Sequence, residues 1–497
     1  MNLLEAAVAA RQLQGLAADK YPHPIDAMKV SLPHSLSRRE MLEWSTWGLT
    51  GAALTNLVQA TPQTVNHFPA KAKRVVHVVL MGGLSHLDSF DYKPGLAKAH
   101  GKPLQYTERP ATFFNRIGLI RKNDWEFRQH GQSGLWISDL FPHIATCADE
   151  LAVVRSMVGT SANHTPATFE ELTGFQLNGF PVMGSWVSYG LGAETENLPT
   201  YVVLPDTRGY PAGGTINWSN GFLSSAHQGV AFGNGETIIP DLKPAQPIAP
   251  GTEAASRKLL AALNADDQKN FGAEDALIAR MKSHELAARM QLTIPEIADL
   301  NRESAATRNN YGLNKDETKD FGRNCLMTRR LLEKGVRFVQ LISGGSFGSP
   351  RINWDGHEDM RRNHNREATR IDQPVAALIK DLKARGMLED TLILFTSEFG
   401  RTPFTQTDGN KLGTGRDHNM YGFSLWMAGG GVKGGISYGN TDEIGWKTVD
   451  QRVHWYDFHA TVLHLLGMDH ERLTFYHNGI ERRLTNVHGH VIKDLLA

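Results

Sequence analysis

The chain has 497 residues, which is enough for two to four domains or for one large α/β domain with insertions. Lys plus Arg and Asp plus Glu each total 52, so the formal net charge is zero, and 41% of the residues are hydrophobic. This composition excludes a disordered chain, a polybasic nucleic-acid binder and an integral membrane protein. Two cysteines, Cys147 and Cys325, exclude a disulfide scaffold and a cysteine-built zinc site, although they could pair once or stay free. The 21 histidines offer metal ligands or proton carriers.

The N-terminal segment has the features of an export signal. The pair Arg38-Arg39 precedes an uncharged, mildly apolar run over residues 44–60, which ends in V-Q-A, a small-residue cleavage site. The run is too short and too polar for a stable membrane span. We therefore expect residues 1–60 to be a twin-arginine signal read by the export machinery, and the mature protein to be periplasmic or secreted. The alternative is an amphipathic surface helix with two solvated arginines.

Apolar runs rich in β-branched residues recur along the rest of the chain. Most lack alternation, which is typical of strands buried on both faces, and helical patterns separate them. The runs cover residues 74–81, 151–157, 200–204, 336–342, 391–396 and 423–428, and helical patterns cover 321–334, 368–385 and 453–466. Over residues 61–497 this order predicts an α/β domain with a mostly parallel sheet sandwiched by helices. Turn-rich sequence and charged helices over residues 205–300 predict an inserted cap.

Candidate metal ligands lie beside these predicted strands, where an open α/β sheet binds its ligands. They are Asp88, Asp355, His357, Glu398, Asp417 and His418. Mixed carboxylate and imidazole ligands suit zinc or manganese better than calcium or magnesium. The sequence predicts that Asp355, His357 and His418 converge on one divalent ion.

Two further segments have residues suited to catalysis. Arg401 follows Glu398 across a glycine turn and would stabilise an anionic oxygen, although the two could instead form a structural pair. Thr165, beside His164, stands at the start of a predicted helix, where backbone N–H groups would stabilise the anion of a hydroxyl nucleophile. The alternative is an ordinary N-cap threonine followed by Pro166 at the first helical position.

Longer motifs carry a family resemblance. They include SRREML, KAKRVVHVVLMGGLSHLDSFDYKPGL, NHTPATFEELTG, DLKARGMLEDTLILFTSEFGRTP, GRDHN and WMAGGGVKGGISYGNTDE. On these motifs the chain resembles the uncharacterised bacterial family DUF1501, within the alkaline phosphatase and sulfatase-like superfamily. The resemblance implies a sheet that carries two metals on Asp/His sets. It also implies a Ser, Thr or modified Cys nucleophile that attacks a phosphate or sulfate ester.

The resemblance assigns roles to individual residues. Asp355 and His357 resemble the Asp/His ligand pair, His418 the late histidine ligand, Glu398 the carboxylate of the strand-end Asp-His-Gly motif, and Thr165 the nucleophile. Three departures stand against it. Phe399 replaces the histidine or asparagine of that motif, Gly82-Gly83 replace a first-strand aspartate, and neither cysteine lies in a C-x-P-x-R sequence. These departures count against one of the two metal positions and against a formylglycine sulfatase.

These observations favour an exported, metal-assisted hydrolase of phosphate or sulfate esters carried by a small molecule or a glycan. The ion would polarise the ester oxygen, and Arg401 would stabilise the equatorial oxygens. The alternative is a non-catalytic protein that binds an anion or a glycan on the same fold. Phe399 and the missing first-strand aspartate favour that alternative.

Overall fold

The computed structural model describes residues 66–233, 238, 249, 251–271, 275–348 and 351–497. The chain divides into two units, Met1–Thr61 and Pro62–Ala497, and every described residue belongs to the second. The expected twin-arginine signal at residues 1–60 lies outside the described residues. None of the helices in the described part has the length and apolar character needed to span a lipid bilayer.

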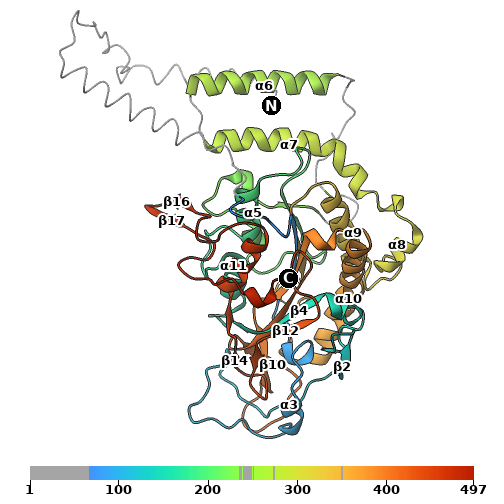
Figure 1. Ribbon diagram of the computed structural model, residues 1–497, viewed down its shortest axis with the longest axis vertical. Coiled ribbons are helices and arrows are strands. Elements are labelled where there is room, and N and C mark those ends of the chain that lie inside the picture. Colours follow the sequence, from blue (N-terminus) through green and yellow to red (C-terminus); the bar gives the residue numbers. More distant parts are fainter. Residues whose placement is uncertain (1–65, 234–237, 239–248, 250, 272–274, 349–350) are drawn as a thin grey trace, which may run out of the picture. The chain divides into compact units, whose positions relative to one another are not determined.

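A nine-stranded sheet forms the centre of the described fold, in the order β12-β4-β11-β8-β1-β7-β5-β6 with β15 beside β4. Two neighbouring strands of this sheet, β4 and β12, are labelled in Figure 1. Its strands are β1 (Arg74–Leu80), β4 (Leu151–Val158), β5 (Tyr201–Leu204), β6 (Val230–Ala231), β7 (Phe338–Ser343), β8 (Thr391–Ser397), β11 (Phe423–Ala428), β12 (Ile436–Tyr438) and β15 (Val453–His454). All pairings are parallel except those of β11, which runs antiparallel to β8 and β4. The predicted α/β fold with a mostly parallel sheet is confirmed.

Strand β1 shows why these segments lack an alternating pattern. Val76 and Val78 belong to one buried hydrophobic cluster, and Val75 and Val79 belong to a second. Successive side chains of a strand point to opposite faces, so a strand covered on both sides needs apolar residues at every position. All four valines are fully buried, and each burial contributes roughly 1.5–3 kcal/mol.

Helices supply the cover on both faces of the sheet. The helices are α3 (Pro94–Lys98), α4 (His164–Thr173), α5 (Met183–Leu191), α6 (Thr252–Phe271), α7 (Asp275–Ala298), α8 (Ala305–Asn310), α9 (Lys319–Glu333), α10 (Met360–Ala384) and α11 (Trp455–Leu465). α9 and α10 contribute to the cluster that holds Val76, whereas α5 and α11 contribute to the cluster that holds Val75. The two layers of helices thus lie on opposite faces of the sheet.

All three expected helices start at a residue other than the expected one, and α9 begins at Lys319 instead of residue 321. α10 begins at Met360 instead of residue 368, because the Asp359 carboxylate caps the helix by accepting the Arg362 N–H at 2.9 Å. The first two turns are polar and show no apolar period, so the pattern does not reveal them. α11 begins two residues later than expected, since residues 453 and 454 pair with β4 as β15.

The segment 205–300, expected to form a cap, also extends the sheet. Its strand β6 pairs in parallel with β5 at the sheet edge, and its helices α6 and α7 line one cavity of about 290 Å³ together. Its interpretation as a cap stays a prediction, because part of the segment lies outside the described residues.

Four two-stranded ribbons accompany the central sheet in the described part. They pair β2 (Phe127–His130) with β3 (Leu135–Ser138), β9 (Gly400–Thr405) with β10 (Arg416–Asn419), β13 (Asn440–Thr441) with β14 (Thr448–Asp450), and β16 (Phe475–His477) with β17 (Ile480–Arg482). Cys147 and Cys325 are buried free thiols, not a disulfide. Burial raises the pKa of Cys147 to about 11, so this side chain is a neutral thiol at pH 7.

Candidate metal centre

The candidate site lies at the carboxyl edge of the parallel strands. β1, β4, β7 and β8 share one direction, because β11 is antiparallel to both β4 and β8. The chain leaves β4 toward His164 at the start of α4, and leaves β7 toward Asp355 and His357, while the β9–β10 ribbon supplies His418. Side chains far apart in the sequence therefore meet at the edge where open α/β sheets bind their ligands.

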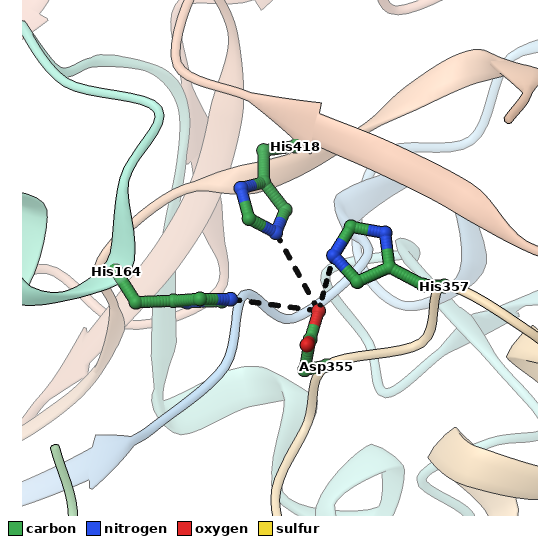
Figure 2. Close-up of side chains that lie close together, drawn as sticks. All are labelled: His164, Asp355, His357 and His418. Atoms are coloured by element: carbon green, nitrogen blue, oxygen red, sulfur yellow. Dashed lines mark ion pairs between the residues drawn. The ribbon is translucent and has the colours of Figure 1, made fainter. Parts of the chain in front are cut away.

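His164, Asp355, His357 and His418 form one cluster (Figure 2), with one ligating atom from each residue within 4.8 Å of the others. The Nε2 atoms of His357, His164 and His418 lie 2.8, 3.5 and 3.5 Å from Asp355 Oδ1. The structure thus brings together Asp355, His357 and His418, as the sequence predicts. His164, expected as a neighbour of the nucleophile, joins them as a fourth member.

The outer nitrogen of each imidazole faces an acceptor. His164 Nδ1 lies 2.7 Å from Glu398 Oε1, His418 Nδ1 lies 2.5 Å from the Ala162 carbonyl, and His357 Nδ1 contacts the Gln406 side-chain oxygen. Acceptors at Nδ1 fix the tautomer in which Nδ1 carries the proton and donates it, so each Nε2 presents its lone pair to the cluster.

Burial favours the neutral imidazoles. It lowers the pKa of His164 and His418, and it lowers that of His357 to about 3, with the Arg401 charge adding to the effect on His357 and His418. Within the described structure, the Nε2 atoms of His164 and His418 are buried and have no hydrogen-bond partner. A buried nitrogen without a partner costs free energy, and a metal ion at the centre of the cluster would satisfy both nitrogens.

The donor set fits a divalent transition metal. Three imidazole nitrogens and one carboxylate oxygen match the ligands that zinc prefers. Two ligand atoms on a tetrahedral zinc ion lie about 3.4 Å apart when each bond is about 2.1 Å long. The three nitrogen-to-oxygen distances of 2.8, 3.5 and 3.5 Å are close to that separation. The residues therefore fit the group that the fold family implies.

Glu398, predicted as a ligand, lies behind His164 and outside the cluster of ligating atoms. Its Oε1 accepts the Gly82 N–H at 2.8 Å, and its Oε2 accepts the Gly83 N–H and the Ser397 hydroxyl, both at 3.1 Å. With His164 Nδ1 also on Oε1, the carboxylate is fully engaged. Glu398 thus orients one imidazole, the arrangement in which a carboxylate raises the basicity of a ligating histidine.

Asp88 and Asp417 also lie outside the cluster. Asp88 is buried against Arg416, with Oδ2 3.2 Å from the guanidinium Nε. Asp417 accepts the backbone N–H of His418 at 2.8 Å and that of Phe114 at 3.0 Å. Both aspartates shape the loops around the site, and the structure does not bring either one to the four ligating atoms.

The backbone at Gly82 and Gly83 explains why no first-strand aspartate stands here. A Cβ on Gly82 would lie 2.6 Å from the backbone nitrogen of Asp355, and a Cβ on Gly83 would lie 2.6 Å from the Phe399 ring. Both glycines have positive φ, at +119° and +81°, where other residues are strained. The space of a first-strand carboxylate is therefore taken by the chain itself.

Phenylalanine rings surround the imidazoles, a feature that the sequence does not predict. Ring centroids lie 4.0 Å apart for Phe347 and His164, 4.4 Å for Phe399 and His418, 4.7 Å for Phe113 and His418, and 4.9 Å for Phe114 and His357. These rings hold the imidazoles in place and exclude water, which strengthens electrostatic interactions inside the site. The only sequence signal was Phe399 at a position where the superfamily has a polar residue.

Arg401 lies in the site, fully buried. Its Nη2 is 2.8 Å from Asp355 Oδ1, and its Nε donates to the Gly83 carbonyl at 2.9 Å. Burial lowers its pKa to about 10, so the guanidinium stays charged at pH 7. The alternative pairing with Glu398 is not the one that the structure shows, because the hydrogen bonds of Arg401 go to Asp355 and to backbone carbonyls.

Thr165 occupies the first turn of α4, partly exposed and next to His164. The N-cap of this helix is Asn163, so the alternative that Thr165 is the N-cap and Pro166 the first helical residue is wrong. Pro166 is the third helical residue, a position that tolerates proline because the first N–H groups of a helix have no intrahelical acceptor.

Solved structures of sulfatases and alkaline-phosphatase-like hydrolases are similar to this chain at low identity. The PsFucS1 sulfatase from Pseudoalteromonas sp. is 15% identical over 86% of this chain and 72% of its own, with a TM-score of 0.35. A mutant of TAB5 alkaline phosphatase with bound Mg is 11% identical over 76% of this chain and 96% of its own, with a TM-score of 0.29. The periplasmic domain of EcEptC from Escherichia coli, in complex with Zn, is 10% identical over 87% and 96%, with a TM-score of 0.31. Likeness at this level concerns the fold alone.

No curated protein matches the chain. A family model does match it, over residues 72–496, and this range includes the whole central sheet and all four residues of the cluster. The chain therefore belongs to the family described as "Protein of unknown function (DUF1501)".

Proposed function

We propose that this protein is a metal-dependent hydrolase of phosphate or sulfate esters on a small molecule or a glycan. One observation carries the proposal: three imidazole nitrogens and one carboxylate oxygen face one another, within 4.8 Å, at the ligand-binding edge of the sheet. The proposed ligands of a zinc or manganese ion are His164, Asp355, His357 and His418. The sulfatase- and phosphatase-like fold is consistent with this chemistry and does not by itself assign it.

Each residue has a proposed role in that reaction. A bound ion would act as a Lewis acid toward the ester oxygen. Arg401, charged and buried beside Asp355, would stabilise the negative charge that develops on the other oxygens. The Thr165 hydroxyl would attack the phosphorus or sulfur atom from the first turn of α4, where unpaired backbone N–H groups stabilise an anion. The alcohol would leave with the hydroxyl proton, and water would then release phosphate or sulfate from the threonine. Glu398 would keep His164 in its ligating tautomer.

A second candidate is a protein that binds an anion or a glycan without turnover. The observation that favours it is the backbone at Gly82 and Gly83, which fills the position of a first-strand carboxylate. Among the described residues only one His/Asp set could hold an ion, whereas the superfamily implies two. A single ion can bind an oxyanion and leave the ester intact.

Elemental analysis and a substrate panel test the proposed hydrolase. The full-length protein is expected to contain about one zinc or manganese per chain and to hydrolyse an aryl phosphate or an aryl sulfate, with activity lost in chelator and restored by the metal. Metal without turnover of any ester would favour the binding protein. A protein that neither contains metal nor takes it up would refute the metal-dependent hydrolase and leave the binding protein in a metal-free form.

We also propose that residues 1–60 direct twin-arginine export to the periplasm or beyond. Fused to a reporter, this segment is expected to deliver the reporter across the membrane, and Arg38→Lys with Arg39→Lys is expected to abolish delivery. Lysine keeps the positive charge, so the loss would report recognition of the arginines by the export machinery. Equal delivery by both fusions would contradict the proposal.

A further inference from the structure

A cavity of about 810 Å³ opens beside the metal cluster, and arginines line it. Arg351, Arg362 and Arg366 contribute to its wall, together with Phe347, Glu358 and Asp359. The volume is sufficient for a ligand of several rings or groups. Arginine binds carboxylate, phosphate and sulfate groups through its planar fork of N–H donors.

Two of the three arginines of this cavity have carboxylate partners: Arg366 Nε lies 2.7 Å from Glu367 Oε1, and Arg351 contacts Asp355 and Glu358. Glu358 pairs with Arg351 at 3.0 Å, and the Asp359 carboxylate caps α10 by accepting the backbone N–H of Arg362. Arg366 and Arg362 are one helical turn apart on α10, where like charges repel. Among the described residues, no ion pair involves the guanidinium of Arg362. The positive charge of the wall is therefore least compensated at Arg362, and Arg366 shares its partner Glu367 with Arg208.

The same wall borders the metal cluster. The Phe347 ring stacks on His164, with centroids 4.0 Å apart. The Arg351 guanidinium contacts Asp355 Oδ2, whose other oxygen faces the three Nε2 atoms. A molecule that reaches the cluster through this side would pass the arginines of α10.

We propose that the cavity binds a second anionic group of the substrate, so that the substrate is an ester with at least one further phosphate, sulfate or carboxylate group. The proposal rests on the proposed hydrolase function for the ester that is cleaved. Binding of an oxyanion by Arg362 and Arg366, however, requires neither metal nor turnover. The two proposals can therefore fail separately.

Calorimetric titration of the full-length protein with inorganic phosphate, sulfate or acetate tests the cavity, both as purified and in EDTA, with circular dichroism to verify the fold. We expect one anion site to persist in EDTA and to weaken at least tenfold in Arg362→Gln/Arg366→Gln. The matched control is Arg361→Gln on the same helix. Its guanidinium donates to the Asp124 carbonyl at 2.6 Å and lies over Trp125, away from the cavity lining.

The three anions distinguish the group that the cavity takes. Preference for phosphate or sulfate would assign a polyphosphorylated or polysulfated substrate, and preference for acetate would assign a carboxylate-bearing one. Absence of anion binding in EDTA, or equal affinity in the double variant and Arg361→Gln, would overturn the proposal. Should the double variant misfold, Arg362→Gln alone serves, because this side chain is exposed.

Discussion

His357→Ala is expected to lower the affinity for the metal more than about a hundredfold and to abolish metal-dependent turnover. Substitution of a residue that only orients a ligand typically costs 10- to 100-fold in metal affinity, and the loss of a ligand costs more. His357 Nε2 lies 2.8 Å from Asp355 Oδ1, at the centre of the cluster. His418→Ala is expected to behave alike, since its Nε2 is buried without a partner.

A graded series tests this assignment. Glu398→Gln keeps the shape of the side chain but weakens the acceptor for His164 Nδ1, so we expect a smaller loss of metal affinity, about 10- to 100-fold. His284→Ala, which removes an exposed imidazole from α7, is the control and should leave metal content unchanged. Competition with a chromophoric chelator measures the metal affinity of the wild type and of the four variants. Full metal content in both His357→Ala and His418→Ala would eliminate this cluster as the metal site.

The sequence predicts the sheet well because its strands are buried on both faces. Continuous apolar runs such as that of β1 reflect two hydrophobic layers, and all six predicted runs are strands. Strand direction is not encoded locally, so the antiparallel course of β11 could not be predicted. The early start of α10 was missed for a different reason, since a side-chain cap, and not apolar periodicity, sets it.

Residues that lie beside the ends of predicted strands could be assigned to one site from the sequence. Asp355, His357 and His418 were expected to meet, and the structure brings them together. Glu398 was expected to be a ligand and His164 a neighbour of the nucleophile. In the structure the histidine faces the cluster and the carboxylate lies behind it. That exchange depends on the Gly82 and Gly83 N–H groups, which engage Glu398. Backbone donors leave no residue-type signal in a sequence.

The phenylalanines around the imidazoles could not be predicted from the sequence either, because the fold and not a local motif brings them together. Phe347 and Phe113 come from loops far apart in the chain, and only the folded strand ends bring them onto His164 and His418. In the sequence, Phe399 indicates the loss of a polar residue, whereas in the structure its ring packs on both His164 and His418. Phe399 at the position of a polar residue thus removes one possible ligand and packs against the histidines of the single cluster.

Thr165→Ala is expected to lower kcat by about a thousandfold or more if the hydroxyl is the nucleophile, while metal content and fold stay intact. Thr165 is partly exposed in the first turn of α4, so loss of its hydroxyl should cost less than about 1 kcal/mol of stability. Because its side chain is not among the four clustered ligands, metal content should not change.

Two matched variants make the Thr165 test specific. Thr165→Ser keeps a hydroxyl at the same position and should retain measurable turnover. Ser161→Ala removes a hydroxyl from the preceding loop, where it accepts the Asn163 N–H at 3.1 Å. This control should leave kcat unchanged. Steady-state rates are measured on the best ester of the panel, and metal content is measured in parallel. Thr165→Ala should lose turnover and keep its metal, whereas His357→Ala should lose both. Wild-type turnover by Thr165→Ala would remove the nucleophile assignment and leave the metal cluster and Arg401 as the residues proposed to carry the reaction.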